Sequence, residues 1–173
     1  MSSELPNTKT IVTHETVETT SKTGVDYQTV IDHFGCQLIT PTILNDLKSL
    51  INKPRLHTFL ERGLFFAHRD FDKLIKQCVI EKKNNFYIYT GRGPSSASLH
   101  IGHLIPFIMA KYFQSVFDVP VIIQITDDEK YFHSKTNATL EEFQNDAMKN
   151  IMDIIACGFD PKKNIYFLEL NIF

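Results

Sequence analysis

The chain contains no tryptophan, and its 173 residues include only three cysteines and no apolar run near the length of a membrane-spanning helix. Its 18 basic and 20 acidic residues leave a formal charge of −2, so it has no basic excess for coating nucleic acid. Cys36, Cys78 and Cys157 are scattered, which argues against a disulfide scaffold and a zinc site. The first 23 residues lack the apolar core of a secretory signal, and the first arginine is Arg55. We therefore expect a cytoplasmic protein without a membrane segment.

Both common glycine fingerprints for phosphate binding are also missing. The sequence contains no G-x-G-x-x-G loop and no Walker A loop, which ends in Gly-Lys-Ser or Gly-Lys-Thr. A nucleotide site in this chain would therefore have to be built from a different loop.

The apolar pattern changes along the chain. Before residue 86, apolar residues recur at helical spacing over 27–34 and 42–51, and again after Asp70, which is a candidate helix cap. From residue 86 the order is strand, helix, strand, helix, strand. The strands are predicted at 86–90, 120–126 and 164–168, and a Thr139–Glu142 capping box opens the second helix.

This alternation predicts an α/β fold with a parallel sheet covered by helices on both faces. It would form the first half of a doubly wound, Rossmann-type nucleotide-binding fold, preceded by a mostly helical N-terminal segment. The predicted division of the chain is a polar tail or weak hairpin over 1–22, the helical segment over 23–85, and the half-fold over 86–173.

The loop that leaves the first predicted strand has the chemistry for binding phosphates. Gly91 and Gly93 allow close backbone approach, and Arg92 supplies a permanently charged planar donor. The following helix start offers unsatisfied N–H groups and the positive end of a dipole. His100 and His103 are three residues apart, so they face the same side of that helix. The pair could be metal ligands or imidazole donors to a polyphosphate, and the surrounding glycines and Arg92 favour the second interpretation, with no metal site.

The tetrapeptide His100-Ile101-Gly102-His103 is the H-x-G-H signature that class I aminoacyl-tRNA synthetases share with related nucleotidyltransferases. Longer segments are more specific. They are LERGLFFAHRDFD at 60–72, FYIYTGRGPSSASLHIGHLIPF at 86–107, VPVIIQITDDEKY at 119–131 and DIIACGFD at 153–160. Together they resemble the tryptophanyl-tRNA synthetases of the eukaryotic and archaeal type over about residues 23–170.

This resemblance implies ATP-dependent activation of tryptophan and its transfer to tRNA(Trp), with Mg²⁺ bound through the ATP phosphates. The matching catalytic residues are His100, His103 and Arg92. Gly93 and Gly102 join these three in the implied ATP site, with Gly102 lying under the adenine. The family also implies a homodimer for the full-length protein.

The resemblance further assigns Tyr89 and Gln124 to the indole nitrogen of tryptophan, and Glu129 and Lys130 to its amino-acid end. An indole N–H is a donor only, so a pocket that selects it needs a buried acceptor. Tyr89 and Gln124 are expected to point into the crevice at the strand ends. The alternatives are that Tyr89 is a core tyrosine and that residues 127–130 form a solvated turn.

The sequence departs from that family in two places. No K-M-S-K-S-type loop and no anticodon-binding domain occur in these residues, and Val12-Thr13-His14-Glu15 replaces a V-T-P-W-type hairpin. We therefore expect an N-terminal catalytic fragment that is inactive alone. The alternative is a shortened, non-catalytic paralogue that binds tryptophan or a nucleotide, and a weaker one is another H-x-G-H nucleotidyltransferase.

Overall fold

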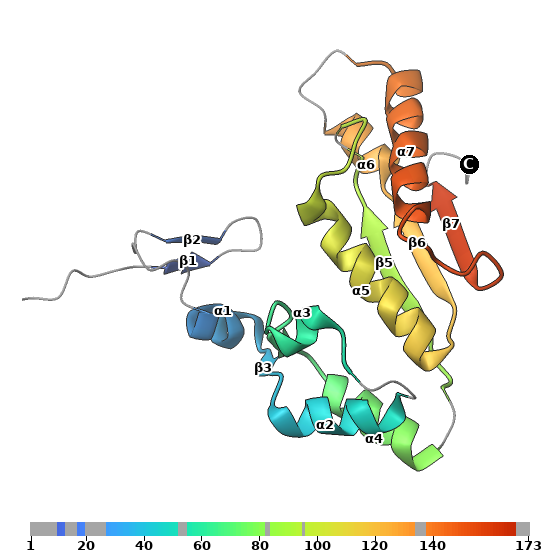
Figure 1. The fold of residues 1–173 in the computed structure, drawn as a ribbon. Helices are drawn as coiled ribbons and strands as arrows, with labels where there is room; N and C mark the ends of the chain where they lie inside the picture. The colour runs from blue at the N-terminus through green and yellow to red at the C-terminus, as the bar shows by residue number, and fades with distance from the viewer. Residues whose placement is uncertain are drawn as a thin grey trace, which may run out of the picture. The chain divides into compact units, whose positions relative to one another are not determined.

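A computed structural model of the chain shows two compact units (Figure 1). The N-terminal unit comprises residues 1–49 and 54–77, and the C-terminal unit comprises residues 50–53 and 78–173.

No helix among the described residues is long and apolar enough to cross a bilayer. The three-part division predicted from the sequence stays a prediction. The structure describes residues 10–12, 17–19, 27–51, 55–81, 84–94, 96–133 and 138–168.

The N-terminal unit combines short strands with short helices. β1 pairs antiparallel with β2, and β3 pairs antiparallel with β4. The predicted departure at residues 13–15 lies outside the described residues. In chain order, the elements as far as the end of α4 are β1 (Thr10–Val12), β2 (Val17–Thr19), α1 (Tyr27–Phe34), β3 (Gln37–Leu38), α2 (Pro41–Leu50), α3 (Thr58–Glu61), β4 (Ala67–His68) and α4 (Phe71–Glu81).

Helix ends in this unit follow local chemistry. α1 ends as predicted before Gly35, whose φ of 60° lies in the left-handed region that glycine adopts without strain. At the start of α4, the Phe71 N–H donates to His68 Nδ1 at 3.1 Å. Asp70 was the predicted cap, but its carboxylate pairs with the Lys73 ammonium at 2.6 Å instead.

The C-terminal unit is built on a three-stranded parallel sheet in the order β5-β6-β7. This confirms the α/β class and the first half of a Rossmann-type fold. The strands alternate with helices, as the sequence predicts. The elements are β5 (Ile88–Arg92), α5 (Ile101–Phe117), β6 (Val121–Ile125), α6 (Asp127–Phe132), α7 (Leu140–Ile155) and β7 (Asn164–Leu168).

The two long helices α5 and α7 pack on the same face of this sheet. The strands are added in one direction, and right-handed crossovers then place both helices on one side. The opposite face carries the exposed side chain of Tyr89 and the half-buried ones of Ile122 and Gln124. The expectation of helices on both faces is therefore wrong for the described residues of this unit. Helices cover the second face only where the strand order reverses.

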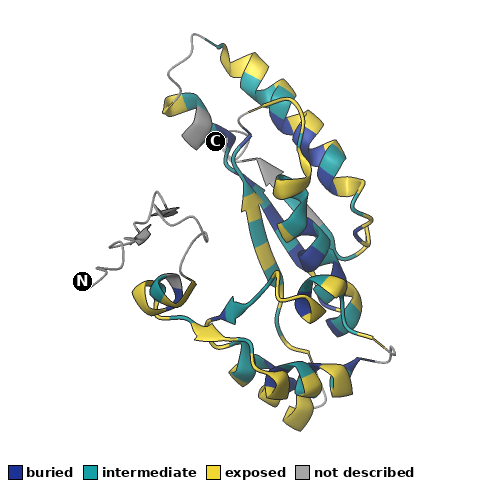
Figure 2. Cartoon of the chain, turned by 60° about the vertical axis from the view of Figure 1, so that its left-hand side comes forward, coloured by how far each residue is buried: buried dark blue, intermediate teal, exposed yellow. Residues whose placement is uncertain are grey.

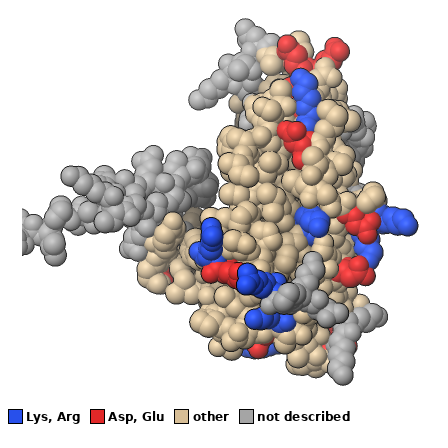
Figure 3. Space-filling model, in the orientation of Figure 1, with Lys and Arg blue, Asp and Glu red and all other residues tan. Residues whose placement is uncertain are grey.

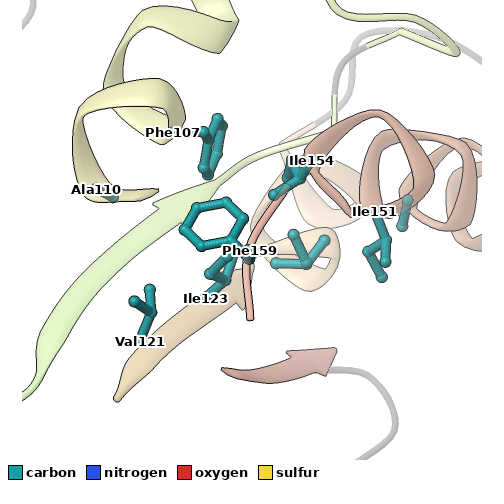
Figure 4. Packing of buried hydrophobic residues seen from close by; sticks show 9 residues of the cluster. Phe107, Ala110, Val121, Ile123, Ile151, Ile154 and Phe159 are labelled. Carbon is teal, nitrogen blue, oxygen red and sulfur yellow. The ribbon is translucent and has the colours of Figure 1, made fainter. Parts of the chain in front are cut away.

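The core of the C-terminal unit lies between the sheet and these two helices. Figure 4 shows Phe107 of α5, Ile123 of β6 and Ile154 of α7 converging with Phe159, which follows α7. Each of these side chains is at most 8% exposed. Burial of one such side chain stabilises the fold by about 1.5–3 kcal/mol relative to its exposure to water.

The capping box predicted for α7 is confirmed. The Glu142 N–H donates to Thr139 Oγ1 at 3.3 Å, and the Thr139 N–H donates to Glu142 Oε2 at 2.7 Å. Gly158, the predicted stop, has a φ of 86° just beyond the helix end. One stripe of α7 is buried and the other is exposed, as Figure 2 shows along the helix.

The predicted boundaries of β5 are shifted by two residues. β5 pairs in parallel register with β6, from Ile88 opposite Val121 to Arg92 opposite Ile125. Gly91 and Arg92 therefore belong to the strand and not to the loop after it. Pairing with β6 sets the ends of β5, and apolar content alone does not reveal that pairing.

Charges of both signs are interspersed on the surface. On the face drawn in Figure 3, Lys and Arg side chains lie next to Asp and Glu side chains. This distribution agrees with the small formal charge of −2.

Two adjacent residues of α7 give a test of the core. Ile154 is fully buried, whereas its neighbour Ile155 is 52% exposed. We expect Ile154→Ala to lower the free energy of unfolding by about 3 kcal/mol, because the substitution leaves a cavity under β6. The matched Ile155→Ala should change it by less than about 0.5 kcal/mol. Urea denaturation of both variants measures the difference, and equal losses would contradict this core assignment.

Candidate active site

Strand geometry divides the candidate site residues between the two faces of the sheet. Successive side chains of a strand point to opposite faces, so Tyr89 and Gly91 share one face of β5, and Arg92 lies on the other. Gln124 is paired with Gly91 in the register of β6, so it shares the face of Tyr89. The candidate amino-acid residues thus lie on the face opposite the core, and Arg92 lies on the face covered by α5 and α7.

Tyr89 and Gln124 meet on the face opposite the core. The Tyr89 hydroxyl donates a hydrogen bond to Gln124 Oε1. Tyr89 is 54% exposed, so the alternative of a core tyrosine is wrong. Because the phenol hydrogen is directed at Gln124, the phenol oxygen presents its lone pairs as acceptors. The pair therefore has the chemistry to accept a hydrogen bond from an N–H donor above the sheet.

Gly91 lies directly across from Gln124, and the space beside it is narrow. A Cβ on Gly91 would come within 3.2 Å of the Gln124 carbonyl oxygen. Glycine at this position therefore permits close approach of two strands next to the Tyr89–Gln124 pair. The sequence pattern predicts Gly91 in the loop, whereas the structure places it in this contact within the sheet.

Arg92 lies between the two helices that cover the core. Its Nε–H donates to Asn150 Oδ1 of α7 at 3.3 Å. Its Nη2 lies 3.5 Å from His103 Nδ1 of α5. Since guanidinium nitrogens only donate, His103 Nδ1 accepts, and the neutral ring carries its proton on Nε2. The structure thus brings Arg92 and His103 together, as the sequence predicts.

The surroundings of His103 favour its neutral form. Loss of solvation lowers the pKa of His103 below its ordinary value of 6.5, and the positive charges of Arg92 and His100 lower it further. Burial also lowers the pKa of Arg92 below its usual value. The cluster therefore offers one permanent cation beside imidazole donors, a combination suited to phosphate oxygens.

His100 and His103 stack at the start of α5. Their ring centroids are 3.6 Å apart with an interplanar angle of 22°, so the predicted shared face is confirmed. His100 occupies the N-cap position of α5, and its side chain makes no capping hydrogen bond. A Cβ on Gly102 would lie 3.1 Å from His100 Cε1, so the ring rests on this glycine. The His100 ring thus contacts the glycine that the resemblance places under the adenine.

The loop between β5 and α5 is held by side chains of α7. Asn150 is fully buried, and its Nδ2 donates to the Ser96 carbonyl at 2.7 Å. One turn later, Asp153 Oδ2 accepts the Leu99 N–H at 3.0 Å. Neither of these α7 residues is predicted from the sequence motifs. The available signal was Asn150 itself, a polar residue that interrupts the buried stripe of that helix.

α6 carries the last two candidate residues. It begins at Asp127, directly after the end of β6, and it includes Glu129 and Lys130, whose side chains lie outside the described part of the structure. Asp127 is 0% exposed, so the alternative of a solvated turn is wrong for this residue.

A cavity of about 370 Å³ lies in the N-terminal unit and not among these residues. Its lining includes Thr40, Asp46, His68 and Lys76, and none of the candidate site residues. Among the described residues, no three His, Cys, Asp or Glu side chains are grouped so that they could hold a metal ion.

The family model for class I tRNA synthetases (W and Y) matches residues 81–173, which is more than half of the chain. The chain belongs to this family. It is 50% identical over 146 residues to the cytoplasmic tryptophan–tRNA ligase of Schizosaccharomyces pombe, and 46% identical over 156 residues to that of Homo sapiens. These matches confirm the resemblance to tryptophanyl-tRNA synthetases that the sequence motifs indicate.

The matches cover most of this chain but a smaller part of each relative. They include 84% and 90% of the chain, and 36% and 32% of the two ligases. The chain therefore spans about a third of the length of these curated relatives. The crystal structure of the Plasmodium falciparum tryptophanyl-tRNA synthetase superposes with a TM-score of 0.79 at 43% identity, over 85% of this chain and 40% of the other.

The contact between Arg92 and His103 predicts a change in titration. Replacing Arg92 by Met removes a positive charge next to the imidazole, so the pKa of His103 should rise toward 6.5. The ring C–H signals of His103, followed by NMR against pH, measure this shift. Lys162→Met, which neutralises an exposed cation beyond α7, is the control and should leave the titration unchanged. An unchanged pKa in Arg92→Met would contradict the contact.

Proposed function

We propose that this chain carries the ATP- and tryptophan-binding part of a cytoplasmic tryptophan–tRNA ligase. The observation that carries this proposal is the Tyr89–Gln124 pair on one face of a class I sheet, with Arg92 at the end of β5 beside His103 of α5. The relatives named above support the substrate, because they are tryptophan–tRNA ligases. Homodimer formation is a further part of the proposal.

Arg92, Gly93, His100, Gly102 and His103 are the proposed ATP site. The Arg92 cation and the Nε2–H of His103 would bind phosphate oxygens beside the N-terminal end of α5, whose N–H groups and dipole favour anions. His100 would have to leave its position over Gly102 for adenine to contact that glycine. Magnesium held by the ATP phosphates would neutralise part of their charge when ATP is bound.

The proposed tryptophan site lies on the face opposite the core. The Tyr89 oxygen, oriented by Gln124, would accept the indole N–H. Glu129 is proposed to hold the substrate ammonium, with Lys130 beside it. An amino acid without this N–H would leave the polar pair unsatisfied, which is a strong means of rejection.

In the proposed reaction, a carboxylate oxygen of tryptophan attacks the ATP α-phosphorus. The new O–P bond replaces the bond to the β-phosphate, and pyrophosphate leaves. The tryptophanyl group then passes from the adenylate to the terminal ribose of tRNA(Trp), and AMP is released. No covalent bond to the protein forms, so these residues would act by positioning substrates and stabilising charge.

Tryptophan-dependent exchange of pyrophosphate into ATP tests this function in the complete protein that carries these residues. We expect exchange in the unaltered protein and a loss of about 10²–10³-fold in His103→Ala, because one donor to the developing charge is removed. His33→Ala, a substitution at an exposed histidine of α1, is the matched control and should retain full activity.

Two outcomes would contradict the proposal. Exchange that does not depend on tryptophan would exclude the substrate. Tryptophan binding without exchange would favour the binding-module alternative. Equilibrium dialysis with labelled tryptophan measures that binding in the complete protein.

Gln124 provides a test of selectivity. Gln124→Leu removes the acceptor that orients the Tyr89 hydroxyl, so kcat/KM for tryptophan relative to phenylalanine should fall by about 100-fold. Gln124→Glu keeps an acceptor oxygen at this position and should retain more of the preference. Exchange assays with both amino acids measure the ratios. Equal preference in Gln124→Leu and the unaltered protein would exclude this role.

A further inference from the structure

Asn150 is a fully buried amide next to the candidate phosphate site. It lies on the core-facing side of α7, one turn from Ala147 and Ile154, both also 0% exposed. A buried polar side chain is costly unless it is hydrogen-bonded, so a residue of this kind needs a structural or functional reason. The packing of the core does not supply that reason, because an apolar side chain would fill the same stripe.

The hydrogen bonds of Asn150 fix the orientation of its amide. Nδ2 donates to the Ser96 carbonyl at 2.7 Å and to the Asp146 carbonyl at 2.8 Å. Both partners are acceptors, so the amino group must face them, and Oδ1 must face the other way. Oδ1 therefore points at Arg92, whose Nε–H it accepts at 3.3 Å.

This arrangement holds the guanidinium of Arg92 from two sides. Its Nε edge faces Asn150 of α7, and its Nη2 faces His103 of α5. Arginine has a long side chain with many rotamers, and its planar group binds phosphate well only when the plane is correctly directed. A fixed acceptor at Nε supplies that direction before a ligand arrives.

We propose that Asn150 is a positioning residue that aims Arg92 at the ATP phosphates. This inference rests on the proposed function, because it assigns Arg92 to the nucleotide. Asn150 also holds the Ser96 carbonyl of the loop, and in this account it does not touch the substrate but affects the nucleotide through Arg92. Because its amide is fixed in the core of the unit, Asn150 holds the Arg92 guanidinium in one orientation.

A double-mutant cycle in the complete protein tests this role. Asn150→Ala should lower kcat/KM for ATP by about ten-fold, because a hydrogen bond to a charged group is lost. The KM for tryptophan should not change. On an Arg92→Met background, the same substitution should lower kcat/KM for ATP by less than about two-fold, since its effect passes through Arg92.

A purely structural role predicts a different pattern. Loss of core stability would weaken both substrates, and its effect would be the same with or without Arg92. Additive losses in the cycle, or a parallel rise in the KM for tryptophan, would overturn the proposal. Asn145→Ala, at an exposed asparagine of the same helix, is the matched control and should behave like the unaltered protein.

A second variant and a binding measurement complete the experiment. If Asn150→Ala does not fold, Asn150→Ser retains one hydroxyl in a smaller side chain, and the same cycle applies to it. Calorimetry with a non-hydrolysable ATP analogue repeats the cycle as binding, without tryptophan. Analogue binding without tryptophan-dependent exchange would exclude the proposed function alone. A cycle that is additive in binding would exclude the role of Asn150 alone.

Discussion

The parallel pairing of β5 with β6 is the constraint on which the rest of the candidate site depends. Its register places Gly91 opposite Gln124 and Arg92 opposite Ile125. Side chains alternate between faces, so this one register puts Tyr89 beside Gln124 and sends Arg92 to the other face. A slip of one residue would exchange these faces and separate Tyr89 from Gln124 and Arg92 from His103. Glycine at position 91 fits that register, because a Cβ there would lie 3.2 Å from the Gln124 carbonyl oxygen.

The two faces of the sheet differ in how they are supported. The face that carries Arg92 is covered by α5 and α7, whose side chains form the core of the unit. Arg92 and the β5–α5 loop are therefore held by groups that cannot move without disturbing buried packing, notably Asn150 and Asp153. The face that carries Tyr89 and Gln124 has no such support from α5 or α7. On that face, the partly exposed side chains of Tyr89 and Gln124 are joined by a hydrogen bond to each other.

Much of the fold could be predicted because its signals are local. A capping box, a left-handed glycine and a run of apolar residues each specify one element within a few residues, and Thr139, Gly35 and β7 show this. The start of β5 and the face covered by the helices could not be predicted in this way. Both depend on pairing between distant segments, which leaves no local pattern.

The same distinction applies to the site. His100 and His103 are close in sequence, so helical spacing alone predicts that they share one side of the helix. The family resemblance predicts that Tyr89 and Gln124 act together on the indole nitrogen. In the structure they are in contact across two neighbouring strands. Asn150 has neither signal, because it lies far from Arg92 in sequence and belongs to no catalytic motif. Its only mark in the sequence is a polar side chain in an apolar stripe.

The fixed position of Arg92 also determines the electrostatics around Arg92 and His103. Arg92 stays charged, and its charge together with desolvation keeps the neighbouring His103 neutral. Full positive charges on both Arg92 and His103 would repel each other at this distance. One fixed cation beside a neutral His103 avoids that repulsion in the free protein. An arriving polyphosphate would supply the negative charge that favours protonated imidazole, so the positive charge of the site would rise only when an anion is present to balance it.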